Sequence, residues 1–149
     1  MKGTLRWLAV AFAVLALACA PSGRPAGPAD AGVVLFNITS GPTDDPHAVT
    51  MALQLAGHAL DDGRVVVLFF NVRGVAAATT ALTDEAAFHA KPIRQLLADL
   101  IGRGAEVHVC PHCMHALGVE PGDLVAGAVV TDREKLFARI GPSTVVFSY

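Results

Sequence analysis

Short runs of β-branched and other apolar residues recur along the chain from residue 32, each separated from the next by a stretch with helical periodicity. Apolar runs of strand length without polar alternation are typical of strands buried on both faces of a sheet. Strands that alternate with helices pair in parallel. The pattern therefore predicts an α/β fold, a three-layer α/β/α sandwich around a five-stranded, mainly parallel sheet. The strands are expected at 32–38, 64–70, 105–109, 124–130 and 143–148.

Helices are expected where apolar residues step by three and four, at 46–61, 92–101, 111–117 and 131–140. Asp45 before Pro46 is typical of an N-cap followed by proline at the first helical position. Thr131 and Glu134 have the spacing of a capping box at the start of the last helix. The stretch 75–90 is rich in Ala and Thr without a clean period, which indicates a loop or a loosely helical cover.

The first twenty residues have the pattern of a secretory signal peptide. Lys2 and Arg6 precede an apolar run at 7–18. This run is shorter than a bilayer-spanning helix. We divide the chain into a lipoprotein-like signal peptide at 1–19, a Pro/Gly-rich tether at 20–31 and one domain at 32–149.

Cys19 is the expected lipidation site, because residues 15–19 resemble a bacterial lipobox. Cleavage at an ordinary small-x-small site, residues 18–20, is the alternative. With lipidation, the domain is exported to the periplasm or the outer face of a bacterial membrane. Its lipid anchor then holds it at the membrane surface.

Composition excludes two other classes of protein. With 53% hydrophobic and 16% charged residues, the chain can bury enough apolar surface to fold. Its 11 Lys and Arg residues are scattered and the formal net charge is -2. Nucleic-acid binding needs dense phosphate neutralisation, so we expect no nucleic-acid partner.

The carboxyl ends of parallel strands lie at one edge of a sheet, and ligands bind there. We expect the loops 40–47 and 71–74 and the segment 110–115 to lie together at this edge. Cys110 ends the third strand where the next helix starts, and unpaired N–H groups at a helix start favour a thiolate. His112, if protonated, favours it too. These residues, together with Cys113, are the catalytic candidates.

Four interpretations of the Cys-Pro-His-Cys stretch remain open. It is a structural or simply oxidised pair, a thiol-disulfide exchanger, a soft-metal site, or a sulfur-handling site with Cys110 as nucleophile. No cofactor is required, although copper or zinc is possible. The metal ligands would be Cys110, Cys113, His112 and His115, with Met114 and His108 as further donors nearby.

Three residues on the neighbouring loops are candidates for binding a substrate. Arg73 could hold an anionic sulfur species, although a solvated arginine is the simpler interpretation. Asn71 lies on the same loop. Asp45 lies on the first loop and is most simply a helix cap.

The order of three motifs resembles the DsrE/DsrF-like family, which is also called the YchN-like fold. The motifs are residues 37–46 before an Ala-rich helix, the strand and Gly-Val turn at 65–75, and the helix-strand-helix stretch 96–118. In the sulfur-relay members of this family, a cysteine at the end of the third strand carries sulfur as a persulfide. Cys110 is the position that matches. The resemblance also implies a homo-oligomer, a trimer or hexamer.

These observations predict an exported DsrE-like domain that handles sulfur or thiol redox chemistry. Cys110 is the nucleophile, Cys113 resolves the intermediate, and the partner is a sulfur-donor or thiol-redox protein. The relay members are cytoplasmic, whereas this chain has a leader and a second thiol at Cys113. A copper- or zinc-binding module and a non-catalytic oligomeric domain are the alternatives.

Overall fold

The computed structural model describes residues 32–89 and 91–149. The expected signal peptide, the tether and the lipidation site Cys19 lie outside the described residues. Within the described part of the chain, no helix is both long enough and apolar enough to cross a membrane.

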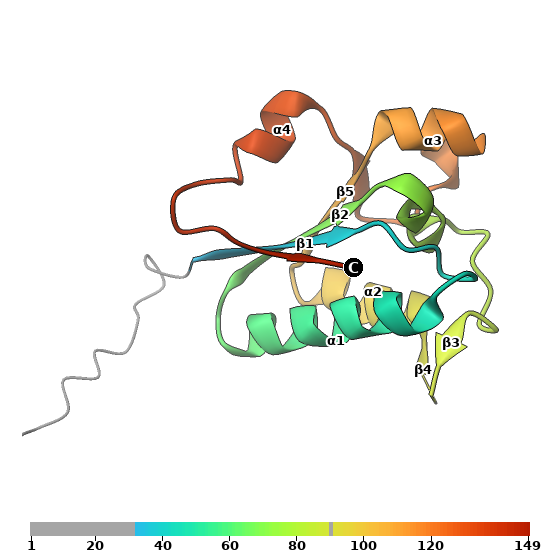
Figure 1. Ribbon diagram of the computed structural model, residues 1–149, viewed down its shortest axis with the longest axis horizontal. Helices are drawn as coiled ribbons and strands as arrows, with labels where there is room; N and C mark the ends of the chain where they lie inside the picture. Colours follow the sequence, from blue (N-terminus) through green and yellow to red (C-terminus); the bar gives the residue numbers. More distant parts are fainter. Residues whose placement is uncertain (1–31, 90) are drawn as a thin grey trace, which may run out of the picture.

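A five-stranded sheet forms the centre of the domain (Figure 1). Its strand order is β6-β5-β2-β1-β7, and every neighbouring pair is parallel. The strands are β1 (Val33–Ile38), β2 (Val65–Phe70), β5 (Glu106–Val109), β6 (Ala128–Val130) and β7 (Val145–Ser148). A separate antiparallel hairpin consists of β3 (Ala87–Phe88) and β4 (Lys91–Pro92).

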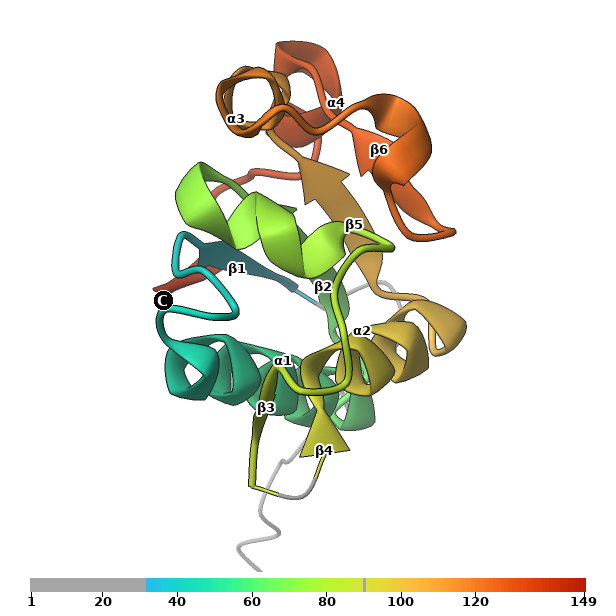
Figure 2. The same ribbon diagram turned by 90° about the vertical axis from the view of Figure 1, so that its right-hand side faces the viewer.

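Helices cover both faces of the sheet, so the domain has the three layers that the sequence predicts (Figures 1 and 2). α1 (Pro46–Asp61) and α2 (Ile93–Gly102) lie below the sheet in these views. Above it lie the 3-10 helix η1 (Val72–Ala78), α3 (Pro111–Leu117) and α4 (Arg133–Phe137). A second 3-10 helix, η2 (Pro121–Asp123), follows α3.

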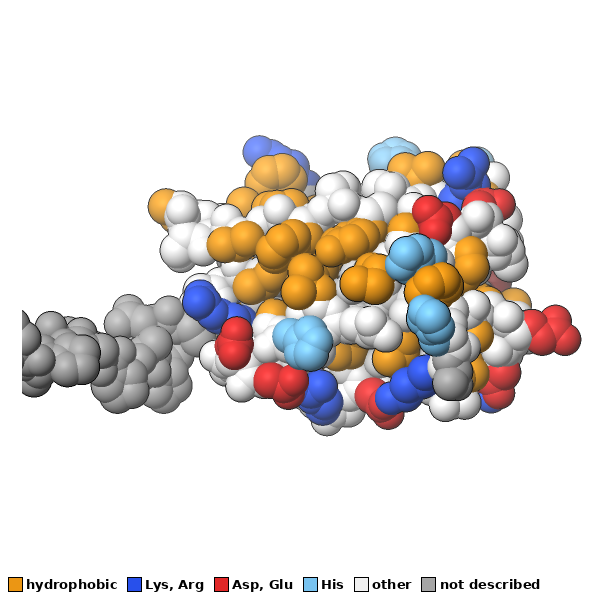
Figure 3. Space-filling model, turned by 60° about the horizontal axis from the view of Figure 1, so that its bottom comes forward, with side chains coloured by type: hydrophobic (Ala, Val, Ile, Leu, Met, Phe, Trp, Pro, Cys, Tyr) orange, Lys and Arg blue, Asp and Glu red, His pale blue; other side chains and the backbone are white. Residues whose placement is uncertain are grey.

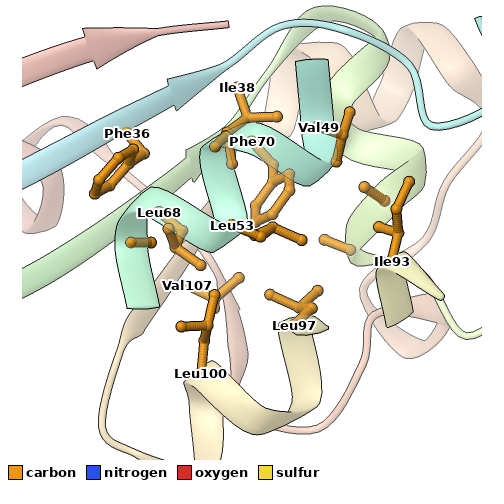
Figure 4. Close-up of a cluster of buried hydrophobic side chains, with 14 of the residues drawn as sticks. Phe36, Ile38, Val49, Leu53, Leu68, Phe70, Ile93, Leu97, Leu100 and Val107 are labelled. Atoms are coloured by element: carbon orange, nitrogen blue, oxygen red, sulfur yellow. The ribbon is translucent and has the colours of Figure 1, made fainter. Parts of the chain in front are cut away.

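The main core lies between the sheet and the two lower helices (Figure 4). Alternate residues of a strand point to the same face, which gives this layer one set of large side chains from each of β1, β2 and β5. They pack against the inward stripe of α1 and α2. The fully buried members include Phe36, Ile38, Val49, Leu53, Leu68, Phe70, Ile93, Leu97 and Val107.

The expected start of α1 is confirmed. Asp45 is the N-cap, and its Oδ1 accepts a hydrogen bond of 2.9 Å from the N–H of Ala48. Pro46 occupies the first helical position, where its missing N–H costs nothing.

The strand expected at 124–130 is wrong in its first half. Only 128–130 pair with β5, because Gly127 has a left-handed φ of 90° that turns the chain before the strand begins. A Cβ at this position would also lie 2.7 Å from a side-chain carbon of Ile101. Leu124 forms an isolated bridge with Thr79 instead.

The capping box expected at the last helix is also wrong. Asp132 is the N-cap, and its side chain accepts a 2.7 Å hydrogen bond from the N–H of Lys135. Thr131 is buried, and its hydroxyl lies 3.0 Å from His108 Nδ1. The helix is also shorter than expected, since it ends at Phe137.

Replacing Leu53 with Ala should lower the free energy of unfolding by about 2–5 kcal/mol, because it leaves a cavity between α1 and the sheet. Urea unfolding followed by circular dichroism measures the change. Gln54→Ala, at the exposed neighbouring position, is the control and should change the free energy by less than about 0.5 kcal/mol. Equal effects of the two substitutions would contradict this account of the core.

Candidate functional site

Cys110 follows β5 directly and is the N-cap residue of α3. Its N–H donates to the carbonyl of Phe70 at 3.0 Å, and its carbonyl accepts from the N–H of Met114 at 3.0 Å. The backbone of Cys110 is therefore bound to β2 on one side and to its own helix on the other. This places the residue at the carboxyl edge of the sheet, as expected.

The second cysteine lies beside the first. Cys110 and Cys113 are free thiols, both half-buried, and they lie close enough for Cys110 to act on the charge of Cys113. The N–H of Val72 donates to Cys113 Sγ at 3.0 Å. The two thiols and the start of η1 therefore form one cluster.

Several effects act on the pKa of the Cys113 thiol, and their net result raises it above its ordinary value. Burial raises the pKa most, because it penalises the charged form. The hydrogen bond from Val72 lowers it in part, and the contact with Cys110 and a negative charge there raise it again. Cys113 is therefore a neutral thiol near pH 7, which suits a resolving cysteine.

The turn that carries Val72 is held tightly against β1. Asn71 donates from its N–H to the carbonyl of Ile38 at 3.0 Å, and Gly74 donates to the carbonyl of Thr39 at 3.1 Å. A Cβ on Gly74 would lie 2.2 Å from the Ile38 oxygen, so only glycine fits there. Between these anchors, Val72 has a left-handed φ of 48°.

The four expected metal ligands do not come together. No three His, Cys, Asp or Glu side chains in the described ranges are grouped to hold a metal ion. At 100° per residue, His112 and His115 project from the side of α3 opposite to the cysteines, and both are exposed. Met114 is buried among hydrophobic side chains, so it is not a free donor.

His108 belongs to a different group of side chains. It is buried, with Nδ1 3.0 Å from the Thr131 hydroxyl and Nε2 3.5 Å from a Glu106 carboxylate oxygen. The same Glu106 oxygen lies 2.7 Å from Arg139 Nε. This network connects β5 to the segment around α4, and His108 has both ring nitrogens occupied by it.

The expected substrate-binding residues all have partners within the chain. Arg73 pairs with Asp44 through Nε and Oδ2 at 2.9 Å. Asn71 donates from its side-chain amide to Asn37 Oδ1 at 2.6 Å. Asp45 caps α1. Asn71 and Arg73 flank Val72 and therefore lie beside the cysteine cluster, whereas Asp45 serves the helix start.

Two cavities in the described part of the chain lie away from the thiols. One of about 430 Å³ is lined by Pro42, Pro46 and part of the 81–86 segment, and neither cysteine lines it. Another of about 340 Å³ lies between α1 and α2. Both thiols are partly exposed, which leaves them accessible to a thiol on another protein.

Residues 32–144 match the model of the DsrE/DsrF-like family. The chain belongs to this family. No curated protein matched the chain in a sequence search.

Two solved structures share this DsrE-like fold. The ychN protein from E. coli is 16% identical and has a TM-score of 0.58, over 78% of this chain and 98% of that one. MTH1491 from Methanobacterium thermoautotrophicum, titled a protein of unknown function, is 16% identical with a TM-score of 0.62. That match covers 79% of this chain and 99% of the other. At this identity the likeness shows the fold alone.

No sequence pattern predicts the contribution of Val72. Nothing in the sequence marks it, since a left-handed φ is unusual for a β-branched residue. A polar chain from Asn71 through Asn37 to the Ser148 hydroxyl was missed too. Its signal was available, because Asn37 is a polar residue inside an apolar strand.

Replacing Cys110 with Ala should lower the pKa of Cys113, because it removes the contact and the charge that raise it. The pH at which iodoacetamide alkylates Cys113 at half its maximal rate should therefore fall. Peptide mapping by mass spectrometry measures the rate at each pH. Leu117→Ala, an exposed change on α3, is the control. An unchanged or higher midpoint in Cys110→Ala would contradict this interaction.

Proposed function

We propose that this DsrE-like domain is exported and handles sulfur or thiol redox chemistry through Cys110 of the Cys110-Pro111-His112-Cys113 motif. One observation carries the proposal. Two free thiols lie close together at the carboxyl edge of a parallel sheet, where ligands of such sheets bind. Membership of a family with sulfur-relay members supports the same chemistry.

In the sulfur reaction, the Cys110 thiolate attacks the outer sulfur of a donor persulfide. A bond forms between Cys110 Sγ and that sulfur, and the donor leaves as a thiolate with the electron pair of the broken bond. Cys113, once deprotonated, attacks Cys110 Sγ and releases the carried sulfur as sulfide. The product is a Cys110–Cys113 disulfide, so the two electrons lost by the cysteines reduce the sulfane sulfur.

The same pair can exchange electrons with a protein disulfide. Cys110 attacks one sulfur of that disulfide and forms a mixed disulfide, which Cys113 resolves. His112 is exposed on the first turn of α3 and faces away from the thiols, so when protonated it acts on Cys110 only as a positive charge at a distance, without contact. Arg73 and Asn71, beside the cluster, contribute polar groups for the donor. The partner in either reaction is a sulfur-donor or thiol-redox protein, and no cofactor is required.

The location in this proposal comes from the leader. A diacylated Cys19 would hold the domain at the periplasmic or outer face of a bacterial membrane. The segment 20–31 would then act as the tether between lipid and domain.

Mass spectrometry of single variants tests the chemistry. With a small-molecule persulfide donor, wild-type protein should gain about 32 Da at Cys110 and then lose about 2 Da relative to the dithiol, as sulfide leaves. Cys113→Ser should retain the added sulfur about tenfold longer or more, because it lacks the intramolecular attacking thiol. Cys110→Ser should gain no sulfur at Cys113. Persulfide on Cys113 alone, or no reaction at either thiol, would refute the proposal.

We also propose that the chain forms a homo-oligomer, a trimer or hexamer, in which β7 is one contact surface. β7 is an edge strand with exposed apolar side chains, and Val146 is 56% exposed. A belt of hydrophobic side chains crosses this side of the molecule, above a band of charged ones (Figure 3). The belt includes the cavity of about 270 Å³ lined by Leu55, Ala59, Val145 and Phe147.

The backbone of β7 is self-complementary along its open edge. Tyr149 bonds to β1 through both its N–H and its carbonyl, so alternate residues, Val146 and Ser148, direct theirs outward. An antiparallel copy centred on Phe147 would pair Val146 with Ser148 of the second copy in both directions. Four hydrogen bonds would then join two sheets around a two-fold axis, which fits the hexamer, since a cyclic trimer has no two-fold axis.

Lysine on a strand edge opposes strand pairing. Val146→Lys should therefore reduce the oligomer to smaller species in sedimentation velocity. Val129→Lys, at the similarly exposed opposite edge of the sheet, should leave the oligomer unchanged. A Val146→Lys variant with the wild-type mass would show that β7 is not the contact.

A further inference from the structure

We propose that the main-chain N–H of Val72 is a catalytic group of the dithiol. It binds the Cys113 sulfur in the reduced protein and stabilises the negative charge that reaches this sulfur when a Cys110–Cys113 disulfide opens. The inference rests on the proposed function and adds to it a residue that no sequence motif marks.

The first observation is the contact itself. The Val72 nitrogen lies 3.0 Å from Cys113 Sγ, within the range of a hydrogen bond to sulfur. Among the influences on Cys113, this N–H is the one that favours its charged form, against burial and against Cys110. The donor therefore lies where a developing thiolate needs it.

The second observation is the backbone of Val72. Its φ of 48° is a strained conformation for a β-branched residue, and strain of this kind persists only where the surroundings impose it. Here Asn71 and Gly74 are both hydrogen-bonded to the end of β1. Gly74 also packs so closely on the Ile38 carbonyl that the turn cannot shift toward β1. The anchors thus hold the N–H toward α3.

The proposed step is the opening of the disulfide by a partner thiolate. The partner sulfur attacks Cys110 Sγ and forms a mixed disulfide, and the Cys110–Cys113 bond breaks. The electron pair of that bond passes to Cys113 Sγ, which becomes a thiolate facing the Val72 N–H. In the reverse direction Cys113 attacks Cys110 Sγ, and the partner thiolate leaves with the electron pair.

The hydrogen bond from the Val72 N–H to Cys113 should also shift the equilibrium between the dithiol and the disulfide. A hydrogen bond to a charged acceptor is stronger than one to a neutral acceptor. At a pH above the pKa of Cys113 the reduced form carries a thiolate, and there the N–H stabilises the reduced form more than the disulfide, in which the sulfur carries no charge. A more stable reduced form makes a dithiol pair more oxidising.

The direct test follows the Val72 amide by ¹⁵N NMR in the reduced and the glutathione-oxidised wild-type protein. The Val72 amide resonance should move on oxidation and should also move in reduced Cys113→Ala, which lacks the acceptor. The Gly74 amide, bonded to backbone carbonyls, is the internal reference. A Val72 amide that moves no more than Gly74 in both comparisons would overturn the inference.

A second test displaces the turn. Gly74→Ala forces the turn away from Ile38. At a pH above the pKa of Cys113, the equilibrium constant for its reduction by glutathione should therefore fall about tenfold, which makes the potential about 30 mV more negative. Gly102→Ala, where an added Cβ meets nothing within 4 Å, is the matched control. A folded Gly74→Ala protein with the wild-type potential would contradict the inference, and the NMR comparison decides the matter if this variant does not fold.

Failure of this inference differs from failure of the proposed function. A wild-type protein that forms no Cys110–Cys113 disulfide in glutathione would refute both. A pair that cycles normally with an unresponsive Val72 amide would refute only the role of Val72.

Discussion

Burial of β1 and β2 on both of their faces is the constraint on which the rest of the structure depends. On the lower face Phe36 and Leu68 pack against α1, and on the upper face the alternate residues Leu35 and Val67 are also buried. Strands that are apolar on both faces need cover on both sides, and crossover helices supply it. Because these crossovers make all pairs parallel, the carboxyl ends of all five strands meet at one edge. The cysteines, Asn71 and Val72 come together there for that reason.

The main elements of the fold could be predicted from the sequence, because periodicity and caps act locally. Asp45 and Pro46 start α1 as expected, and four of the five strands lie within a residue or two of the expected positions. The failures have long-range causes. Thr131 does not cap α4 because its hydroxyl is used by His108, 23 residues away. Gly127 ends up in a turn packed against Ile101 of α2, and no local pattern indicates such a contact.

The site was predictable to a similar degree. The position of Cys110 follows from its place at the end of a parallel strand. The spacing of the motif indicates that Cys113 lies near it. The metal hypothesis counted donors along the sequence, but the short helix α3 sends its histidines and cysteines to opposite sides. The part played by Val72 could not be predicted, because it depends on a backbone N–H whose direction is decided by contacts with β1.

The strand order also bears on how the domain reaches its native state. β7 pairs with β1, so the Asn37 side chain bonds to Ser148 across 111 positions of sequence. Synthesis on the ribosome starts at the amino end, so β1 is made early. Its outer edge stays unpaired until β7, the last strand, has been made. Contacts this distant in sequence slow folding. The nascent chain therefore remains incompletely folded until nearly all of the domain has been made, which is compatible with threading it through a membrane in an extended state.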